Sequence, residues 1–259
     1  MSTVSLIAHQ SRYDLRIFLR DPRARGFTVA LPVILLLLFG YIFRHETFKS
    51  GNVVVSGDAY YLPRMIVLGL VSCALSNLVI VLVSKRESGA LKRRRATPVR
   101  AWTLIAGDVI TSEVSAVTIA VLLGLIGWFA LDVHLAAAAI GFVVLTVVVG
   151  TAALCGVSYA LSAVIKSVDS AGPLVMLIMF AVNAVSGIYI PESLFPAWLQ
   201  DAAQALPVRP LAIAMQAAIS PQSNGGRQFA WPELLIVVGW GIAGTLFALA
   251  RFSWTPSKQ

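Results

Sequence analysis

Six long apolar runs, none holding a charged residue, constrain the fold of this chain more than any other feature. They cover residues 26–43, 65–84, 114–131, 135–165, 170–191 and 234–250. A helix needs about 20 apolar residues to cross the hydrocarbon core of a membrane. Of the 259 residues 58% are hydrophobic and only 12% are charged, too few to give six buried helices a soluble surface. The pattern predicts an all-α membrane protein with six transmembrane helices, in a single domain over residues 1–259.

The segment before the first run predicts a helix on the membrane surface. Residues 1–25 contain two Asp and five Arg, a mixture that is too long and too acidic for a signal peptide. Within it Leu6, Tyr13 and Ile17 fall on one side of a helix, with arginines at four-residue spacing beside them. Pro22 disfavours helical geometry at Asp21, so the helix should end there.

Positive charge is concentrated in residues 85–100, KRESGALKRRRATPVR, which hold seven of the 20 Lys and Arg residues. If the N-terminus is cytoplasmic, the inside segments carry fifteen basic residues and the outside segments five, which favours this orientation. Both termini and the basic segment are then cytoplasmic. Glu87 or Ser88 can cap a short helix that Thr97 and Pro98 end.

Three uses of the basic segment are open. The charges can set topology and bind anionic headgroups, the short helix can dock into a soluble partner, or the segment can bind nucleic acid. Nucleic-acid binding is disfavoured for so short a segment beside a membrane. Topology alone does not require a capped helix with a proline stop, so we favour docking.

Two carboxylates precede the third apolar run. A helix that begins near Trp102 places Asp108 and Glu113 near the inner interface, paired with Lys or Arg. Otherwise Glu113 reaches into the bilayer, where a charge is costly, and could attract a cation or carry a proton. We favour the interfacial pairs.

Prolines punctuate the segment between the last two runs, residues 189–231. Pro196 suits the first turn of a short helix and Pro207 marks its end. The segment is too apolar for a solvated loop, which predicts short extracellular or re-entrant helices.

Several motifs carry no catalytic function. GWGIAG at residues 239–244 has glycine-rich spacing but lies inside the last run with no strand before it, so its glycines favour close helix packing over a dinucleotide site. No Walker sequence is present, and Cys73, Cys155 and three scattered histidines form no ligand pattern. We therefore expect no enzyme activity, metal or cofactor in this chain.

Three motifs in order give the chain a family resemblance. They are FLRDP at residues 18–22, the pattern E-x-G-x-L-K-R-x-x-A-T-P at residues 87–98, and SGIYIPESLFPAWLQDAAQALPVRPL at residues 186–211. With six runs around them, the chain resembles the membrane subunits of type-2 ABC exporters. These include drug-efflux and polysaccharide-export permeases, and the chain resembles the drug-efflux group more.

The resemblance implies partners and a coupling site. Residues 1–25 would form an elbow helix, and the basic segment would form a cytoplasmic coupling helix between spans two and three. It would dock two soluble ABC ATPase subunits, which hold ATP and Mg. A second permease subunit, identical or homologous, would complete the complex in a bacterial cell membrane, in contact with lipid. The expected coupling residues are Glu87, Ser88, Gly89, Leu91, Lys92, Arg93, Arg94, Arg95, Thr97 and Pro98.

The expected function is export of an amphiphilic or hydrophobic compound, such as a drug, antibiotic or lipid-like molecule. Alternatives are glycan or glycolipid export within the same family, and an ATP-independent proton-coupled carrier that uses Glu113. The candidate route residues are Asn77, Glu113, Asn183 and Tyr189, and the candidate outer gate is Pro191, Pro196 and Trp198.

Overall fold

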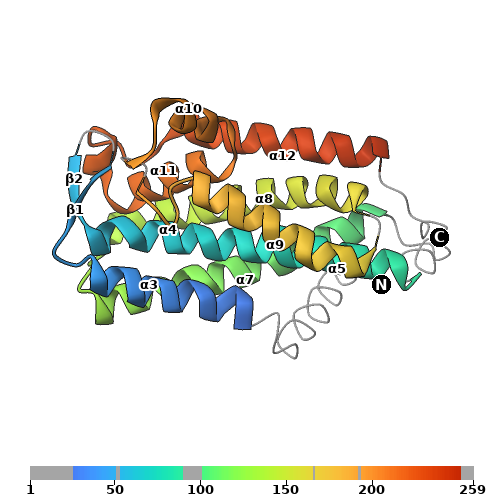
Figure 1. Ribbon diagram of the computed structural model, residues 1–259, viewed down its shortest axis with the longest axis horizontal. Helices are drawn as coiled ribbons and strands as arrows, with labels where there is room; N and C mark the ends of the chain where they lie inside the picture. Colours follow the sequence, from blue (N-terminus) through green and yellow to red (C-terminus); the bar gives the residue numbers. More distant parts are fainter. Residues whose placement is uncertain (1–25, 51–52, 90–100, 166, 192–193, 252–259) are drawn as a thin grey trace.

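The computed structural model describes residues 26–50, 53–89, 101–165, 167–191 and 194–251. Within these ranges the chain is a bundle of helices with one short β-hairpin (Figure 1). The predicted elbow helix at residues 1–25 and most of the basic segment, residues 90–100, lie outside them. We call the end of the bundle that carries the hairpin the hairpin end. The opposite end, next to residues 90–100, is the basic end.

Five helices are long and apolar enough to cross a membrane. The first is the continuous helix Gly57–Glu87, which we call the central span and which is made of α4 (Gly57–Val71), the π-helix η2 (Ser72–Asn77) and α5 (Leu78–Glu87). The other four are α7 (Ala101–Ala130), α8 (Ala137–Val164), α9 (Val168–Val185) and α12 (Trp231–Arg251). The first apolar run, residues 26–43, forms η1 (Gly26–Ala30) and α3 (Leu31–Ile42), and the part of this helix that the structure describes is shorter than a full span. Five of the six predicted spans therefore have helices of sufficient length, and the span predicted from the first run stays a prediction.

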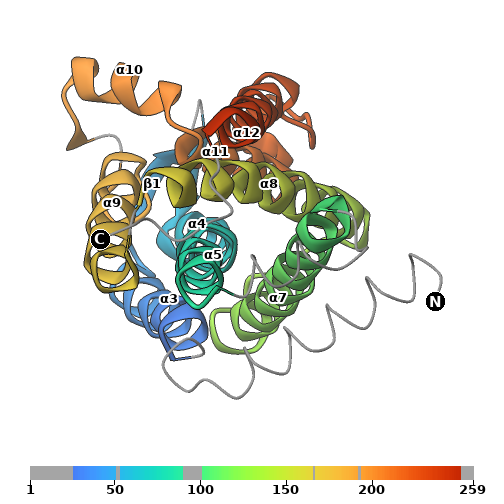
Figure 2. The same ribbon diagram turned by 90° about the vertical axis from the view of Figure 1, so that its right-hand side faces the viewer.

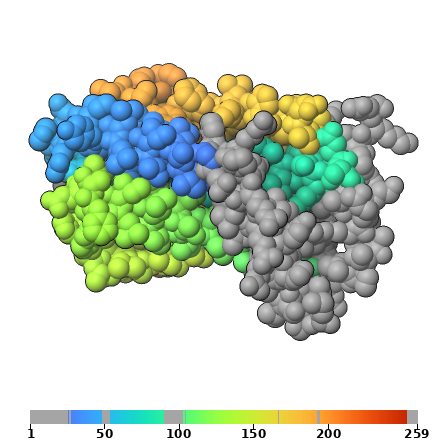
Figure 3. Space-filling model, turned by 90° about the horizontal axis from the view of Figure 1, so that it is seen from below, coloured from blue at the N-terminus to red at the C-terminus, as the bar shows by residue number. Residues whose placement is uncertain are grey.

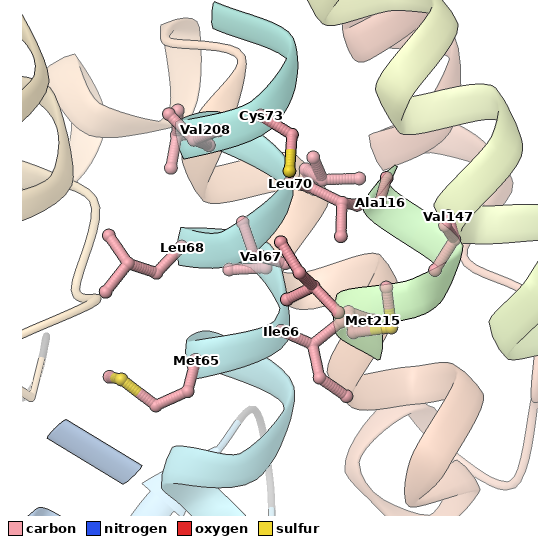
Figure 4. Packing of buried hydrophobic residues seen from close by; sticks show 14 of the residues in the cluster. Met65, Ile66, Val67, Leu68, Leu70, Cys73, Ala116, Val147, Val208 and Met215 are labelled. Atoms are coloured by element: carbon pink, nitrogen blue, oxygen red, sulfur yellow. The ribbon is translucent and has the colours of Figure 1, made fainter. Parts of the chain in front are cut away.

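The α4 helix runs through the middle of the bundle because it is apolar on every side. All its residues from Tyr60 to Val71 are buried, and it packs against α3, α7 and α11. Figure 2 shows α4 and α5 surrounded by α3, α7, α8 and α9. In the core, Leu70 of α4 lies beside Ala116 of α7, and Ile66 lies beside Met215 (Figure 4).

Glycines bring α8 and α12 into backbone contact, as predicted for GWGIAG. A Cβ on Gly156 of α8 would lie 2.3 Å from the carbonyl oxygen of Gly241, and one on Gly244 would lie 2.6 Å from the carbonyl oxygen of Gly156. No side chain fits between the helices at these positions. Gly239 has nothing within 4 Å of its Cβ position, so only part of the motif packs.

The β-hairpin is a departure from the all-α prediction. Strands β1 (Thr47–Ser50) and β2 (Val53–Ser56) pair antiparallel between α3 and α4. Phe48 on β1 packs 5.1 Å from the ring of Tyr60 and 5.6 Å from that of Phe43, centroid to centroid. These aromatic contacts attach the hairpin to the bundle, whereas the local sequence lacks the long alternation that marks a strand.

Two short helices follow α9, as the prolines predict. The α10 helix (Ala197–Ala205) starts directly after Pro196, and α11 (Val208–Ile219) starts after Pro207. Nearly all of α11 is buried against α4, α8 and α12, although it is too short to span a membrane. A buried half-length helix is tolerated because protein covers its backbone ends. A short 3-10 turn, η4 (Pro221–Asn224), leads on to α12.

Candidate functional site

A cavity of about 1160 Å³ lies between η1–α3, α9 and the central span, with α7 closing its basic end. We call it the α3–α9 cavity. Figure 3 shows the face of the molecule where α3, α7 and α9 reach the surface. The apolar residues of the cavity wall are Leu31, Leu35, Leu68, Leu78, Ile80, Val81, Val175, Met176, Leu177, Met179 and Phe180. Its polar residues are Thr28, Ser72, Ser76, Asn77, Ser84, Lys85, Asp108, Thr111, Ser112 and Tyr189. The wall therefore offers both apolar surface and hydrogen-bonding groups to a ligand.

The π-helix η2 interrupts the central span where it meets this cavity. A π-turn takes carbonyl groups out of the regular hydrogen-bond pattern of an α-helix, and such turns are frequent at functional sites. Here Ser158 of α8 donates its hydroxyl to the carbonyl of Ala74 and also to that of Leu154, the latter at 2.8 Å. The π-helix ends at Asn77, so both Ser76 and Asn77 reach the cavity wall from it.

An ion pair lies in the wall at the basic end of the cavity. The Lys85 ammonium is 2.7 Å from Oδ1 of Asp108, and the Tyr159 hydroxyl donates to Oδ2 at 3.0 Å. The Lys85 and Asp108 side chains are 19% and 7% exposed. The α7 helix begins at Ala101, next to Trp102, and Asp108 has the Lys partner that the sequence predicts.

The four predicted route residues do not share one site. Asn77 and Tyr189 line the cavity, whereas Asn183 is fully buried and Glu113 is absent from the cavity wall. Tyr189 stacks on Phe180 with ring centroids 5.9 Å apart. Burial raises the pKa of Tyr189, so its hydroxyl stays protonated at neutral pH.

Among the described residues, Glu113 has no interfacial partner of the kind that the sequence predicts. Both its carboxylate oxygens are buried and accept no hydrogen bond from the part of the chain that the structure describes. It lies five residues beyond Asp108 within the membrane span Ile105–Ala130. An ionised carboxylate in such a place is costly unless a cation or water reaches it.

Replacing Glu113 with Met should stabilise the chain. The substitution removes a buried carboxyl group that has no hydrogen-bond partner among the described residues, which costs about 1–3 kcal/mol, and keeps a side chain of similar length. The free energy of unfolding in mixed micelles measures the gain, with the exposed Glu46→Met as the control expected near zero. A loss of stability would mean that the carboxylate has a partner in the folded chain. A fall in transport beside the gain would assign Glu113 to the transport route.

Arg64 anchors the hairpin end, a role that is not among the predictions from sequence. Its side chain is 2% exposed inside α4, donates to the Gly187 carbonyl at 3.1 Å, and donates to Oε1 of Gln216 at 3.0 Å. The guanidinium carbon also lies 3.4 Å from the centre of the Tyr60 ring. Arg64 therefore joins α4, the turn after α9 and α11. The available sequence signal is an arginine with apolar residues on both sides.

The predicted gate residues are split between the surface and the interior. Pro191 is buried, whereas Pro196 and Trp198 are exposed, Trp198 by 69%. The α10 helix that carries Trp198 is held by Trp240 of α12, whose indole donates to the Ala205 carbonyl at 2.7 Å. A gate role for these three residues stays a prediction.

Only the start of the predicted coupling site lies within the described residues. Leu91, Lys92, Arg93, Arg94, Arg95, Thr97 and Pro98 are outside them. The Glu87 carboxylate accepts from the backbone N–H of Val168 at 2.8 Å, at the start of α9, and the helix that it is predicted to cap lies outside the described residues. The Ser88 hydroxyl donates to the Lys85 carbonyl behind it, and Gly89, with φ +68°, follows the end of α5.

Arg86 completes the contacts at the end of α5. Its guanidinium donates to the Ser162 carbonyl at 2.9 Å and to the Ile165 carbonyl, at the end of α8. Lys85, Arg86 and Glu87 thus bind α7, α8 and α9 in turn. Within the described ranges, no cluster of three His, Cys, Asp or Glu could hold a metal ion, and Cys73 and Cys155 are free and buried.

Comparison with known proteins identifies the family. The model of the ABC-2 type transporter family matches residues 8–219, which is well over half of the chain. No curated protein matches the chain. Members of this family are the membrane components of transporters. They are not themselves catalytic, and they associate with ABC ATPase subunits. With five helices of spanning length, the protein is a multi-pass membrane protein. The chain belongs to the ABC-2 type transporter family.

Proposed function

We propose that this chain is the permease subunit of an ATP-driven exporter that moves an amphiphilic or hydrophobic compound, such as a drug, antibiotic or lipid-like molecule, out of a bacterial cell. Two separate ABC ATPase subunits hold ATP and Mg and supply the energy. A second permease subunit, identical or homologous, completes the complex. Both termini and residues 85–100 face the cytoplasm, and the hairpin end faces outside. Membership of an ATPase-linked family supports this over the proton-coupled carrier considered from the sequence.

The observation that carries the proposal is the set of contacts at the end of α5. Lys85, Arg86 and Glu87 each bind a different span, and the rest of the basic segment follows directly after them. A displacement of that segment by a docked ATPase would pull on α7, α8 and α9 together. Such rigid links can convert a local movement into a change between two packings of the bundle.

The α3–α9 cavity is the proposed route for substrate. Its volume of about 1160 Å³ is at the upper end for sites that bind drug-sized ligands, and most of its wall is apolar. Asn77 and Tyr189 are its expected hydrogen-bonding residues. ATP binding and hydrolysis would shift the equilibrium between cavities open to either side of the membrane. Arg64, at the outer end, would have to release Gly187 or Gln216 for an exit to form there.

Export of a glycolipid is the second candidate. The stacked rings of Phe180 and Tyr189 lie at the cavity wall, and a flat aromatic surface suits the apolar face of a sugar. Stimulation of ATP hydrolysis by amphiphilic drugs but not by lipid-linked sugars would favour the first candidate, and the reverse would favour the second.

Reversing the charge of Arg93, Arg94 and Arg95 to Glu should abolish binding of the ATPase while membrane insertion continues. Three basic residues become acidic at the proposed docking helix, and like-charge contacts at an interface cost several kcal/mol. Copurification of the ATPase with the tagged chain measures the effect. The control is Arg251→Glu, a single exposed charge at the end of α12. Copurification at the wild-type level would remove the docking role from this segment.

A further inference from the structure

Glu113 is a carboxyl group inside a membrane span, and the proposed function gives it no role. It lies about 12 Å along the helix axis from the first residue of the span Ile105–Ala130. Both carboxyl oxygens are buried, and neither has a hydrogen-bond partner among the described residues. Buried polar groups in proteins normally have such a partner, so a buried group without one calls for an explanation.

The neighbours of Glu113 on α7 show that it faces the interior of the bundle. Residues three and four positions apart on a helix share a face. Three of the four residues at these positions, Val109, Ala116 and Val117, pack with the hydrophobic core. Ala116 is fully buried beside Leu70 of α4 (Figure 4). The surroundings of Glu113 on its own helix are therefore largely apolar.

The helices packed against α7 are α3, α4, η2 and α8, and none of their described ionisable groups is seen to bind Glu113. The Cys155 thiol of α8 lies near Glu113, and a thiol in apolar surroundings is neutral. Toward the basic end, Lys85 and Tyr159 both bind Asp108. The remaining ionisable side chains of these four helices are Cys73, which lies near Cys155, and, nearer the hairpin end, Tyr41, Asp58, Tyr60, Tyr61 and Arg64.

These surroundings favour the neutral form of the Glu113 carboxyl group. An ionised carboxylate without a cation beside it is far more costly to bury than a carboxylic acid, and a group in this position takes up a proton instead. The acid then buries only one O–H donor and its acceptor oxygens, with no net charge. In the packing seen here, Glu113 therefore holds a proton.

The α3–α9 cavity lies next to this buried acid. Ser112, the residue before Glu113, belongs to the cavity wall together with Thr111 and Asp108. Ser112 is also hydrogen-bonded to the Cys155 thiol, which lies near Glu113 between α7 and α8. A shift of α7 against α8 would let water from the cavity reach the carboxyl group. A glutamic acid in contact with water at neutral pH ionises, because its ordinary pKa is about 4.3.

We propose that Glu113 is a proton-binding site of the transport cycle, which holds a proton in this packing of the bundle and releases it when α7 and α8 move apart. In the release step the O–H bond of the acid breaks, its electron pair stays on the carboxylate, and a water molecule of the cavity accepts the proton. The return to this packing takes a proton up again. ATP remains the source of energy, so the chain is not a proton-driven carrier. The release step rests on the proposed function, whereas the bound proton does not.

Infrared spectroscopy of the full chain in lipid nanodiscs tests the bound proton and needs no ATPase. A protonated carboxylic acid has a C=O stretching band that a carboxylate lacks. At neutral pH, the difference spectrum between wild type and Glu113→Gln should contain this band. The matched control is Glu46→Gln, which changes an exposed carboxyl group before β1. Its difference spectrum should contain carboxylate bands alone.

A second measurement covers a Glu113→Gln variant that does not fold. Carbon-13 labelling of the glutamate carboxyl groups of the wild-type chain should shift the acid band to lower frequency, which assigns the band to a glutamate. The absence of an acid band at neutral pH would mean that Glu113 is ionised, as it is beside a cation, and would overturn the site. An acid band that persists in a folded Glu113→Gln variant would overturn it as well.

Proton release is measured on the complex of the chain with its ATPase, in weak buffer with a pH-indicator dye. Binding of a non-hydrolysable ATP analogue should release about one proton more per permease chain from wild type than from Glu113→Gln. Equal release would remove Glu113 from the transport cycle. An acid band in a chain that purifies without any ATPase would keep the proton site and remove the ATP-driven function. A copurifying ATPase beside a chain without the band would do the reverse.

Discussion

Replacing Arg64 with Leu should lower the free energy of unfolding by about 3 kcal/mol, since hydrogen bonds to a charged group contribute about 1.5–3 kcal/mol each. The guanidinium holds the Gly187 carbonyl and the Gln216 amide, both distant in sequence. Leucine fills much of the same space but leaves these acceptors without a donor. The loss should be measured by SDS titration of the purified chain in mixed micelles, followed by tryptophan fluorescence.

The matched substitutions isolate the role of the guanidinium. Arg64→Lys keeps the charge but cannot form the planar fork, so we expect an intermediate loss. Arg227→Leu changes an exposed arginine of the same hairpin end and should leave the stability near that of wild type. Equal stability of Arg64→Leu and wild type would mean that α11 and the turn after α9 are held by other contacts.

Replacing Gly241 with Val should separate α8 from α12. The Cβ would lie 2.6 Å from the Cα of Ala153, a backbone atom that cannot turn aside. Forcing extra methyl groups into a packed interface costs about 1–3 kcal/mol, and more where backbone must move. We expect a loss of about 3 kcal/mol in the same titration and a smaller yield in the membrane.

The control for this packing lies two residues away on the same helix. Gly239 has nothing within 4 Å of its Cβ position, so Gly239→Val should leave the stability at or slightly above that of wild type, because valine has a higher helix propensity than glycine. Similar losses for both substitutions would mean that glycine content, and not contact with α8, explains the effect.

The spans and the short helices could be predicted from sequence because their signals are local. Apolar length gives the long helices, and Pro196 and Pro207 mark the two ends of α10 as predicted, whereas the start of α11 directly after Pro207 is seen only in the structure. The glycines of the last span predicted close packing, and α8 is the helix that they contact. The start of α7 near Trp102 and the lysine partner of Asp108 also followed from local charge patterns.

The functional contacts depend on residues far apart in the chain. Arg64 reaches Gly187 and Gln216, and Glu87 reaches Val168, so no local window contains either pair. The cavity needs walls from several helices, and the π-helix at residues 72–77 has no marker in SCALSN. Glu113 is predicted to pair at the interface because a charge inside the bilayer is costly, but it lies five residues along the helix from Asp108, on a different side, and has no partner among the described residues.

The most direct measurement is purification of the tagged chain from its native membrane in mild detergent, with an assay of bound protein for ATP hydrolysis. The account predicts that an ABC ATPase copurifies and that amphiphilic compounds raise its rate of hydrolysis. The Arg93, Arg94 and Arg95 to Glu variant should lose that activity. A pure, folded chain without any nucleotide-hydrolysing partner would contradict the assignment of this protein as an ATP-driven permease.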